Sequence, residues 1–238
     1  MRQIIFIAFA FFTLPAFAQT PKKNKFDLSE RAADHFMLQI SSDHWTNVPD
    51  SIDSHIKGFS RGGNVYLMLD KPFKGNQKVS VGLGVGVGTS SIFFKRMEVG
   101  IESTTSKLPF RSTDSTNYFK KYKVATSFLE VPLELRYSSN PATPNKSFKM
   151  ALGIKGGVLL NAHTKGKNLK SNSNTNINSY TQKLLSKSFF NSSRFVATAR
   201  VGYGIFGIFG AYNFTSIFKD GVAPDMKLYQ VGITISGL

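Results

Sequence analysis

Four histidines, His35, His44, His55 and His163, are the residues of this chain best suited to metal binding or acid–base catalysis. They lie far apart in the sequence, without the closely spaced acidic or histidine partners of a zinc site. Serine–histidine chemistry would use His44 or His163, yet no nucleophile elbow or pair of carboxylates accompanies them. The chain has no cysteine, which excludes thiolate metal sites and disulfides. We therefore expect no enzyme activity, metal or cofactor, and keep a lipid-modifying enzyme as an alternative.

A row of glycines, Gly82, Gly84, Gly86 and Gly88, could suggest nucleotide binding. Their spacing is strictly two, whereas the dinucleotide fingerprint needs a three-residue step at a strand-to-helix turn. Small residues on one face of a strand, which leave room for bulky neighbours, explain the row more simply.

The segment from Ala125 to Tyr137 has the residue pattern of a β-strand. Its odd-numbered positions from Leu129 onward are apolar, and its even-numbered positions hold Glu130, Pro132, Glu134 and Arg136. Charges that would scatter around a helix all point one way in a strand. Pro132 cannot donate to the ladder, so a bulge or local break is expected there.

The same alternation recurs in seven further segments, which makes eight strands: 36–41, 64–70, 79–88, 149–161, 194–203, 206–214 and 229–236. A soluble sandwich or a lipocalin-like barrel would also alternate, with its apolar face inward. The inverted arrangement is favoured because glycine, serine, threonine and isolated charges on the polar face suit a cramped lumen. Aromatic residues near strand ends on the apolar face suit interfacial girdles: Phe36, Phe59, Tyr137, Tyr203, Tyr212 and Tyr229. The expected fold is all-β, an eight-stranded antiparallel up-and-down transmembrane β-barrel.

The connections alternate in length as such a barrel requires. If the first strand runs outward, the outer connections are about 43–58, 94–121, 164–188 and 219–225. The inner ones are about 72–77, 138–147 and a tight turn near Gly204.

The first eighteen residues have the layout of a secretory signal, with Arg2, an apolar run from Ile4 to Leu14, and Ala16-Phe17-Ala18 before Gln19. The apolar run is too short to cross a bilayer as a helix. We expect a signal peptide over 1–18, a barrel domain over 19–238 with a periplasmic lead at 19–33, and a bacterial outer-membrane location.

Seven charged residues fall on the expected lumen face: Asp70, Glu130, Glu134, Arg136, Lys155, Arg194 and Arg200. An eight-stranded barrel is only wide enough for its side chains to fill it, and buried charges need partners. These residues are therefore expected to pair across the lumen as a plug, with a proton or small-ion path as the alternative.

A second charged set lies in the third outer connection and consists of Lys165, Lys167, Lys170, Lys183 and Lys187. These lysines surround an Asn/Ser-rich stretch, 171–179, whose composition is typical of a mobile, solvated loop. A contact surface for lipopolysaccharide phosphates or a partner protein is the alternative. The formal charge of +16 fits such acidic partners. Expected partners are outer-membrane lipid, lipopolysaccharide and other envelope proteins, and export argues against nucleic acid.

The segment Phe128-Leu129-Glu130-Val131-Pro132-Leu133-Glu134-Leu135-Arg136-Tyr137 resembles the E-x-P-L-x-L-R-Y strand of PorT-like outer-membrane β-barrel proteins of the Bacteroidota. The glycine-alternating strand at 79–88 and the closing strand at 228–235 resemble the same family. The resemblance implies an outer-membrane barrel with a structural or interaction role, and one branch of the family is linked to type IX secretion and gliding. A secretion-accessory role is thus the finer expectation, and a narrow channel or small-ligand-binding barrel is the alternative.

Overall fold

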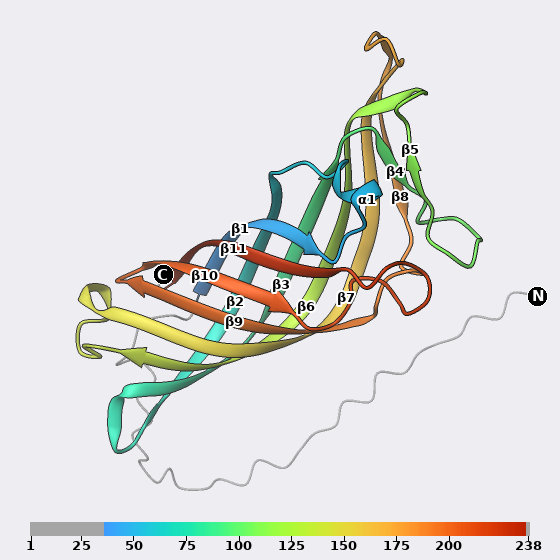
Figure 1. Ribbon diagram of the computed structural model, residues 1–238. Helices are drawn as coiled ribbons and strands as arrows, with labels where there is room; N and C mark the ends of the chain where they lie inside the picture. The colour runs from blue at the N-terminus through green and yellow to red at the C-terminus, as the bar shows by residue number, and fades with distance from the viewer. Residues whose placement is uncertain (1–35, 237–238) are drawn as a thin grey trace, which may run out of the picture. The chain divides into compact units, whose positions relative to one another are not determined.

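The computed structural model describes residues 36–236, and the predicted signal peptide, the periplasmic lead and His35 lie outside that range. Eight antiparallel strands form a closed ring in the order β6-β3-β2-β1-β11-β10-β9-β7, and the pairing of β7 with β6 closes it. The eight expected strands and the barrel are confirmed (Figure 1). The ring strands are β1 Phe36–Thr46, β2 Ser60–Phe73, β3 Asn76–Phe94, β6 Tyr118–Ser138, β7 Phe148–Lys170, β9 Ser193–Tyr203, β10 Phe206–Asn213 and β11 Lys227–Ser236.

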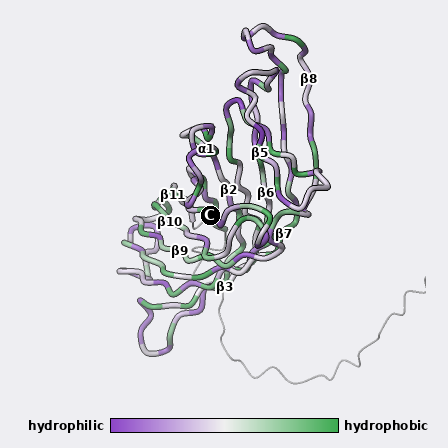
Figure 2. The backbone as a smooth tube through the Cα atoms, turned by 45° about the vertical axis from the view of Figure 1, so that its right-hand side comes forward, coloured by the Kyte–Doolittle hydropathy of each residue, from purple (hydrophilic) through white to green (hydrophobic). Residues whose placement is uncertain are grey.

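The two faces of each strand separate as the alternation predicts, with the apolar face turned outward. On β6, Leu133 is 44% exposed while the neighbouring Glu134 is only 4% exposed. Hydrophobic and hydrophilic positions accordingly alternate along the strands in Figure 2. Outward apolar rows and a polar, enclosed lumen are the arrangement of a membrane barrel, the reverse of a soluble one. The expected girdle residues Phe59, Tyr137, Tyr203 and Tyr212 are all exposed on this outer surface.

Short connections lie at one end of the ring and long ones at the other, which we call the outer end. At the inner end, β9 and β10 are joined by a tight turn in which Gly204 has a positive φ of 62°. A Cβ there would also approach the carbonyl of Asn145, so both the backbone conformation and the available space require glycine. A 3₁₀ turn, Pro144–Lys146, lies in the β6–β7 connection. Across residues 36–236, the helices are all too short or too polar to span a bilayer.

The third outer connection differs from its expectation. Instead of a mobile loop over 164–188, β7 continues to Lys170 and turns back as β8, Asn176–Leu185. Pairs such as Thr164–Leu184 join the two strands into a hairpin that extends beyond the ring (Figure 1). The Asn/Ser-rich composition belongs to the tip and to a strand with both faces in water, so the predicted loop is corrected to a β-hairpin.

The outer end is covered by one hydrophobic cluster, which we call the outer cap. It brings together α1 (Asp50–Asp53), the small sheet of β4 (Met97–Val99) and β5 (Phe110–Ser112), and the connections around 186–192 and 214–226. Trp45 lies against it, with its ring centroid 5.7 Å from those of Phe94 and Phe218. The Tyr122 hydroxyl ties β4 to β6, accepting from the Val99 N–H (2.9 Å) and donating to the Val99 carbonyl (3.0 Å). The cap core contains Ile52, Ile92, Phe94, Met97, Val99, Ile101, Leu108, Phe119, Tyr122, Val124, Phe128, Leu159, Ala162, Phe189, Phe190, Phe218, Met226 and Leu228.

Pro132 locally interrupts one of its two ladders, as expected. The pairing of β3 with β6 passes from Leu83–Leu133 to Gly86–Glu130 without the pairs between them, and the register continues unchanged. A true register shift lies elsewhere, between Ser127 and Phe128 in the β6–β7 ladder.

Candidate functional site

The structure places the seven expected lumen charges inside the barrel and brings them together in two groups. The first is centred on Glu130, which has no solvent exposure. Its Oε1 accepts from Arg194 Nη2 (2.7 Å) and Nε (2.9 Å), and its Oε2 lies 3.4 Å from Lys155 Nζ. The Tyr66 hydroxyl donates to the same Oε2. Each oxygen of this carboxylate therefore has charged or hydroxyl donors, which a buried carboxylate requires.

The second group is centred on Glu134. Its Oε2 accepts from Arg136 Nε at 2.9 Å and from Arg200 Nη2 at 3.1 Å. Arg136 Nη1 also lies 3.6 Å from Asp70 Oδ1, which accepts from the Ser80 hydroxyl at 2.7 Å. Arg136 thus connects two carboxylates near the inner end of the lumen.

Strand register explains how such large side chains fit. Residues of five adjacent strands form one row across the lumen wall, in which every second member is glycine: Tyr66, Gly86, Glu130, Gly157 and Arg194. The row four residues further along the strands repeats the pattern with Asp70, Gly82, Glu134, Gly153 and Thr198. Each glycine leaves the space that its bulky neighbours occupy.

The position of Gly88 shows how tightly that space is used. A Cβ built on Gly88 would lie 2.5 Å from Glu130 Oε2 and 2.8 Å from Arg194 Nη2. The glycine row of β3 is therefore a steric requirement of the ion-pair network, which agrees with the interpretation of these glycines as space for neighbouring bulk.

Two participants were missing from the expected set. Asp43 is buried and accepts from the Ser41 hydroxyl and from Gln230 Nε2 at 3.0 Å. It continues the inward series of Met37, Gln39 and Ser41 by the same step of two, a signal present in the sequence. Tyr66 shares the face of Asp70 in the strand expected over 64–70, but its partner Glu130 is distant in the sequence, so no local pattern predicts their contact.

With Asp43 included, four carboxylates face four cations inside the barrel. Ion pairs in such a setting must compensate a desolvation penalty of several kcal/mol per ion, which requires nearly complete pairing. Arg194 adds a cation–π contact, with its Cζ 4.0 Å from the centroid of Phe128. The arrangement can hold the wall strands together across the lumen and can fill it.

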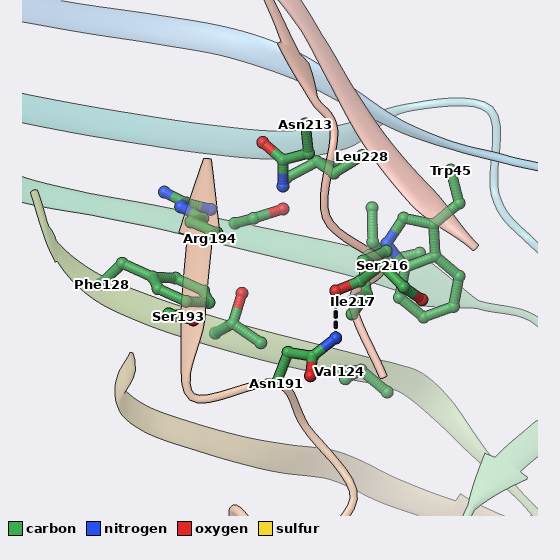
Figure 3. Close-up of a pocket in the computed structure, with 13 residues that line it drawn as sticks. Trp45, Val124, Phe128, Asn191, Ser193, Arg194, Asn213, Ser216, Ile217 and Leu228 are labelled. Atoms are coloured by element: carbon green, nitrogen blue, oxygen red, sulfur yellow. Dashed lines mark hydrogen bonds between the residues drawn. The ribbon is translucent and has the colours of Figure 1, made fainter. Parts of the chain in front are cut away.

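A small cavity lies where the ion pairs meet the outer cap (Figure 3). It has room for roughly one or two water molecules. Arg194 and Asn213 line its lumen side, and Trp45 and Leu228 line its cap side. Asn191 closes part of the wall by donating from Nδ2 to the Ser216 carbonyl at 2.8 Å. The cavity is too small for an organic ligand.

The histidines within the described range are dispersed, as expected. His44 stacks on Tyr229 with centroids 5.0 Å apart, and its Nε2 lies 2.9 Å from the Ser42 hydroxyl. His163 lies on the outer face of β7, opposite Ala125 of β6. Among residues 36–236, no group of three or more histidine and acidic side chains could hold a metal ion.

His55 forms the one histidine ion pair given by the described residues, with Nε2 3.0 Å from Asp114 Oδ2. This contact joins the first and second outer connections in solvent. The Ser112 hydroxyl donates to Asp114 at 2.8 Å. That hydrogen bond, followed by the one with His55, lowers the pKa of Asp114 below its ordinary value of 3.8.

The five expected lysines are spread over the β7–β8 hairpin and the segment after it. Lys165, Lys167, Lys183 and Lys187 are exposed, and Lys170 donates to the side-chain oxygen of Asn174 at 2.8 Å near the tip. Lys165 and Lys183 are directly opposed in the ladder. The structure thus brings some of this set together and disperses the rest.

Comparison with known proteins gives one family. No curated protein matches the chain. The family model described as the outer membrane protein beta-barrel domain matches residues 17–219, which is most of the chain and seven of the eight ring strands. Together with the closed ring and its outward apolar rows, this match shows that the chain belongs to the outer membrane protein beta-barrel domain family.

Proposed function

We propose that this protein is a closed, non-enzymatic outer-membrane barrel that acts as a structural or interaction protein through its outer cap and hairpin. The observation that carries the proposal is that the barrel is blocked at two levels. Ion pairs centred on Glu130 and Glu134 occupy the lumen, and the hydrophobic cap covers its outer end. An open channel needs a water-filled, polar lumen.

Ordered outer segments support the interaction role. A barrel that only anchors itself has no use for a packed cap built from distant connections, because solvated loops would suffice. The hairpin beyond the cap also exposes the apolar side chains of Ile177, Tyr180 and Leu185. Apolar groups on a protruding element are typical of contact surfaces.

We further propose that the chain is PorT-like and that its partner is a secretion assembly of the type IX class. Support comes from the resemblance of the strand 128–137. In this barrel that strand supplies Glu130, Glu134 and Arg136 to the lumen and Pro132 to the break in the ladder.

Planar-bilayer recording of the purified protein tests the occlusion. We expect no steady single-channel current in the native protein. A steady, ion-selective current would contradict the proposal and would favour the narrow channel instead.

Photo-crosslinking in cells tests the interaction role. A crosslinking amino acid at Tyr180, on the hairpin, should capture an envelope protein reproducibly. The same group at Leu152, on the lipid-facing surface and 64% exposed, serves as the control. Capture at neither position, together with normal protein secretion in a deletion strain, would contradict both the interaction role and the secretion link.

A lipid-modifying enzyme at the rim is a second candidate, favoured by the 2.9 Å contact of His44 with Ser42. A working pair also needs a group that orients the imidazole. Within the described residues, the contacts of His44 are this hydroxyl and the ring of Tyr229, with no carboxylate among them. Unchanged lipid profiles after His44→Ala and His163→Ala would remove this candidate.

A further inference from the structure

On strands β2, β3, β6 and β7, the lipid-facing surface of the barrel becomes more polar, row by row, toward the outer end. The last fully apolar row consists of Val65, Val87, Leu129 and Val158. The next row outward has small or polar residues, namely Gly63, Thr89, Ser127 and Asn161. Such a sequence of rows follows a bilayer from hydrocarbon into its interface.

Beyond these rows lies a line of cations. Lys123 of β6 is directly opposite Lys165 of β7, which is directly opposite Lys183 of β8. We call these three residues the lysine row. Arg61 of β2 joins it at the other side of Phe93, whose ring lies 5.7 Å from both Arg61 Cζ and Lys123 Nζ. The charge extends one step further outward, where Lys121 is opposite Lys167.

The lysine row is electrostatically unbalanced. Like charges directly opposite each other destabilise a sheet. Among residues 36–236, Lys165 and Lys183 form no ion pair, and Lys123 donates only to the Ser91 hydroxyl at 3.0 Å. The carboxylate of Glu102 also contacts β8, but its partner there is the Leu185 backbone N–H (3.1 Å) and not a lysine of the row. A sheet that keeps three opposed lysines is suited to an anion supplied from outside.

The position of the row indicates which anion. Lys123 lies six positions before Leu129 on β6, which is about 20 Å along a strand and about 15 Å along the membrane normal for a tilted strand. The long lysine side chains can reach back toward the membrane from there. The row therefore lies at the level of lipid headgroups and shares one continuous surface with the lipid-facing residues.

We propose that Lys123, Lys165 and Lys183, with Arg61, form a binding site for the phosphate groups of outer-leaflet lipid headgroups. The occupant is the phosphorylated glycolipid that surrounds the barrel, held between strands β2, β6, β7 and β8. This site is separate from the lumen and from Ile177 and Tyr180 of the proposed interaction surface, whereas Leu185 lies two residues along β8 from Lys183.

Binding of fluorescent lipopolysaccharide to the purified full chain in neutral detergent tests the site. Lys123→Gln/Lys165→Gln/Lys183→Gln should weaken binding about tenfold or more, because each cation near an anionic surface contributes separately. The control, Lys74→Gln/Lys78→Gln/Lys146→Gln, removes the same charge from exposed positions at the inner end of the barrel and should bind normally. Since Lys123 is half-buried, the double variant Lys165→Gln/Lys183→Gln keeps the test valid if the triple variant does not fold.

Two further binding measurements identify the ligand. Dephosphorylated lipopolysaccharide should bind the native protein as weakly as the intact lipid binds the triple variant, and millimolar inorganic phosphate should not compete. Equal loss of binding in the control variant would overturn the site. Undiminished binding of dephosphorylated lipid, full competition by inorganic phosphate, or tighter binding of an acidic peptide than of the lipid would overturn the assignment of its ligand.

Discussion

Lys155 donates a 2.9 Å hydrogen bond from its Nζ to the hydroxyl of Tyr66, although the two residues belong to strands β7 and β2, which are not neighbours in the ring. Both side chains also meet Glu130 Oε2. The contact therefore crosses the lumen and bypasses β6 and β3. A barrel crosslinked in this way is held by its interior as well as by its ladders.

Glu130→Gln should destabilise the barrel by about 3–5 kcal/mol, because it leaves Lys155 and Arg194 buried without their anion. Urea unfolding from lipid vesicles measures the effect. Asp225→Asn is the matched control, since its pair with Lys227 spans 3.7 Å and the Asp225 carboxylate is exposed. We expect less than about 1 kcal/mol from that change. Equal effects from both substitutions would show that the lumen network adds nothing.

Two glycines of β7, one inward and one outward, allow the steric role of the inward glycines to be tested. A Cβ on the inward Gly153 would lie 2.5 Å from the Leu133 carbonyl oxygen, whereas one on the outward Gly156 meets nothing nearer than Phe195 at 3.9 Å. We expect Gly153→Ala to cost about 1–3 kcal/mol through overpacking, and Gly156→Ala to be neutral or slightly stabilising. The same vesicle assay compares them. Tolerance of both substitutions would mean that the lumen is looser than these contacts indicate.

Trp45 is the only tryptophan of the chain, so its fluorescence reports on the outer cap. Phe218→Ala removes a fully buried ring against it and should cost about 3–5 kcal/mol. It should also shift the Trp45 emission to longer wavelength as water enters. Phe214→Ala, on the exposed outer face, is the control and should leave the emission unchanged. A cap that plays no part in stability would give the same emission in both variants.

The Asp114 carboxyl should titrate below pH 3.8, because the Ser112 and His55 hydrogen bonds favour its ionised form. A depressed folded pKa means that this group stabilises the folded state above the ordinary carboxyl pKa. That contribution is lost as the pH falls through the lower folded value. Carboxyl NMR titration should show the pKa returning toward 3.8 in Ser112→Ala, and to a smaller extent in His55→Ala. An unchanged value in Ser112→Ala would assign the shift to another group.

Strands and faces could be predicted from the sequence because each strand of the ring contacts two different environments. Leu133 and Glu134 differ in polarity for that reason, and the alternation survives in every ring strand. The hairpin strand β8 has water on both faces, so it carries no such alternation and resembles a loop. What stabilises it is pairing with β7, which no local pattern reveals.

For the lumen site, only the types of residue present could be predicted from the sequence. The sequence indicates that charges and glycines share the lumen face, but which glycine lies beside which charge depends on the register between strands. Gly86 and Glu130 become neighbours only once β3 and β6 are paired. The outer cap was unpredictable for a similar reason, since Ile52, Leu108 and Phe218 are isolated in the sequence and meet only in the fold.

Spin-label accessibility on β6 tests most directly whether the apolar rows touch hydrocarbon. The chain has no cysteine, so single substitutions Val131→Cys, Leu133→Cys and Leu135→Cys can be labelled without interference. In lipid vesicles, labels at these positions should be relaxed strongly by oxygen and weakly by a water-soluble nickel chelate, with Lys183→Cys giving the opposite pattern. Labels at 131, 133 and 135 that are shielded from both reagents, or open to the nickel chelate, would contradict the membrane-facing assignment of this surface.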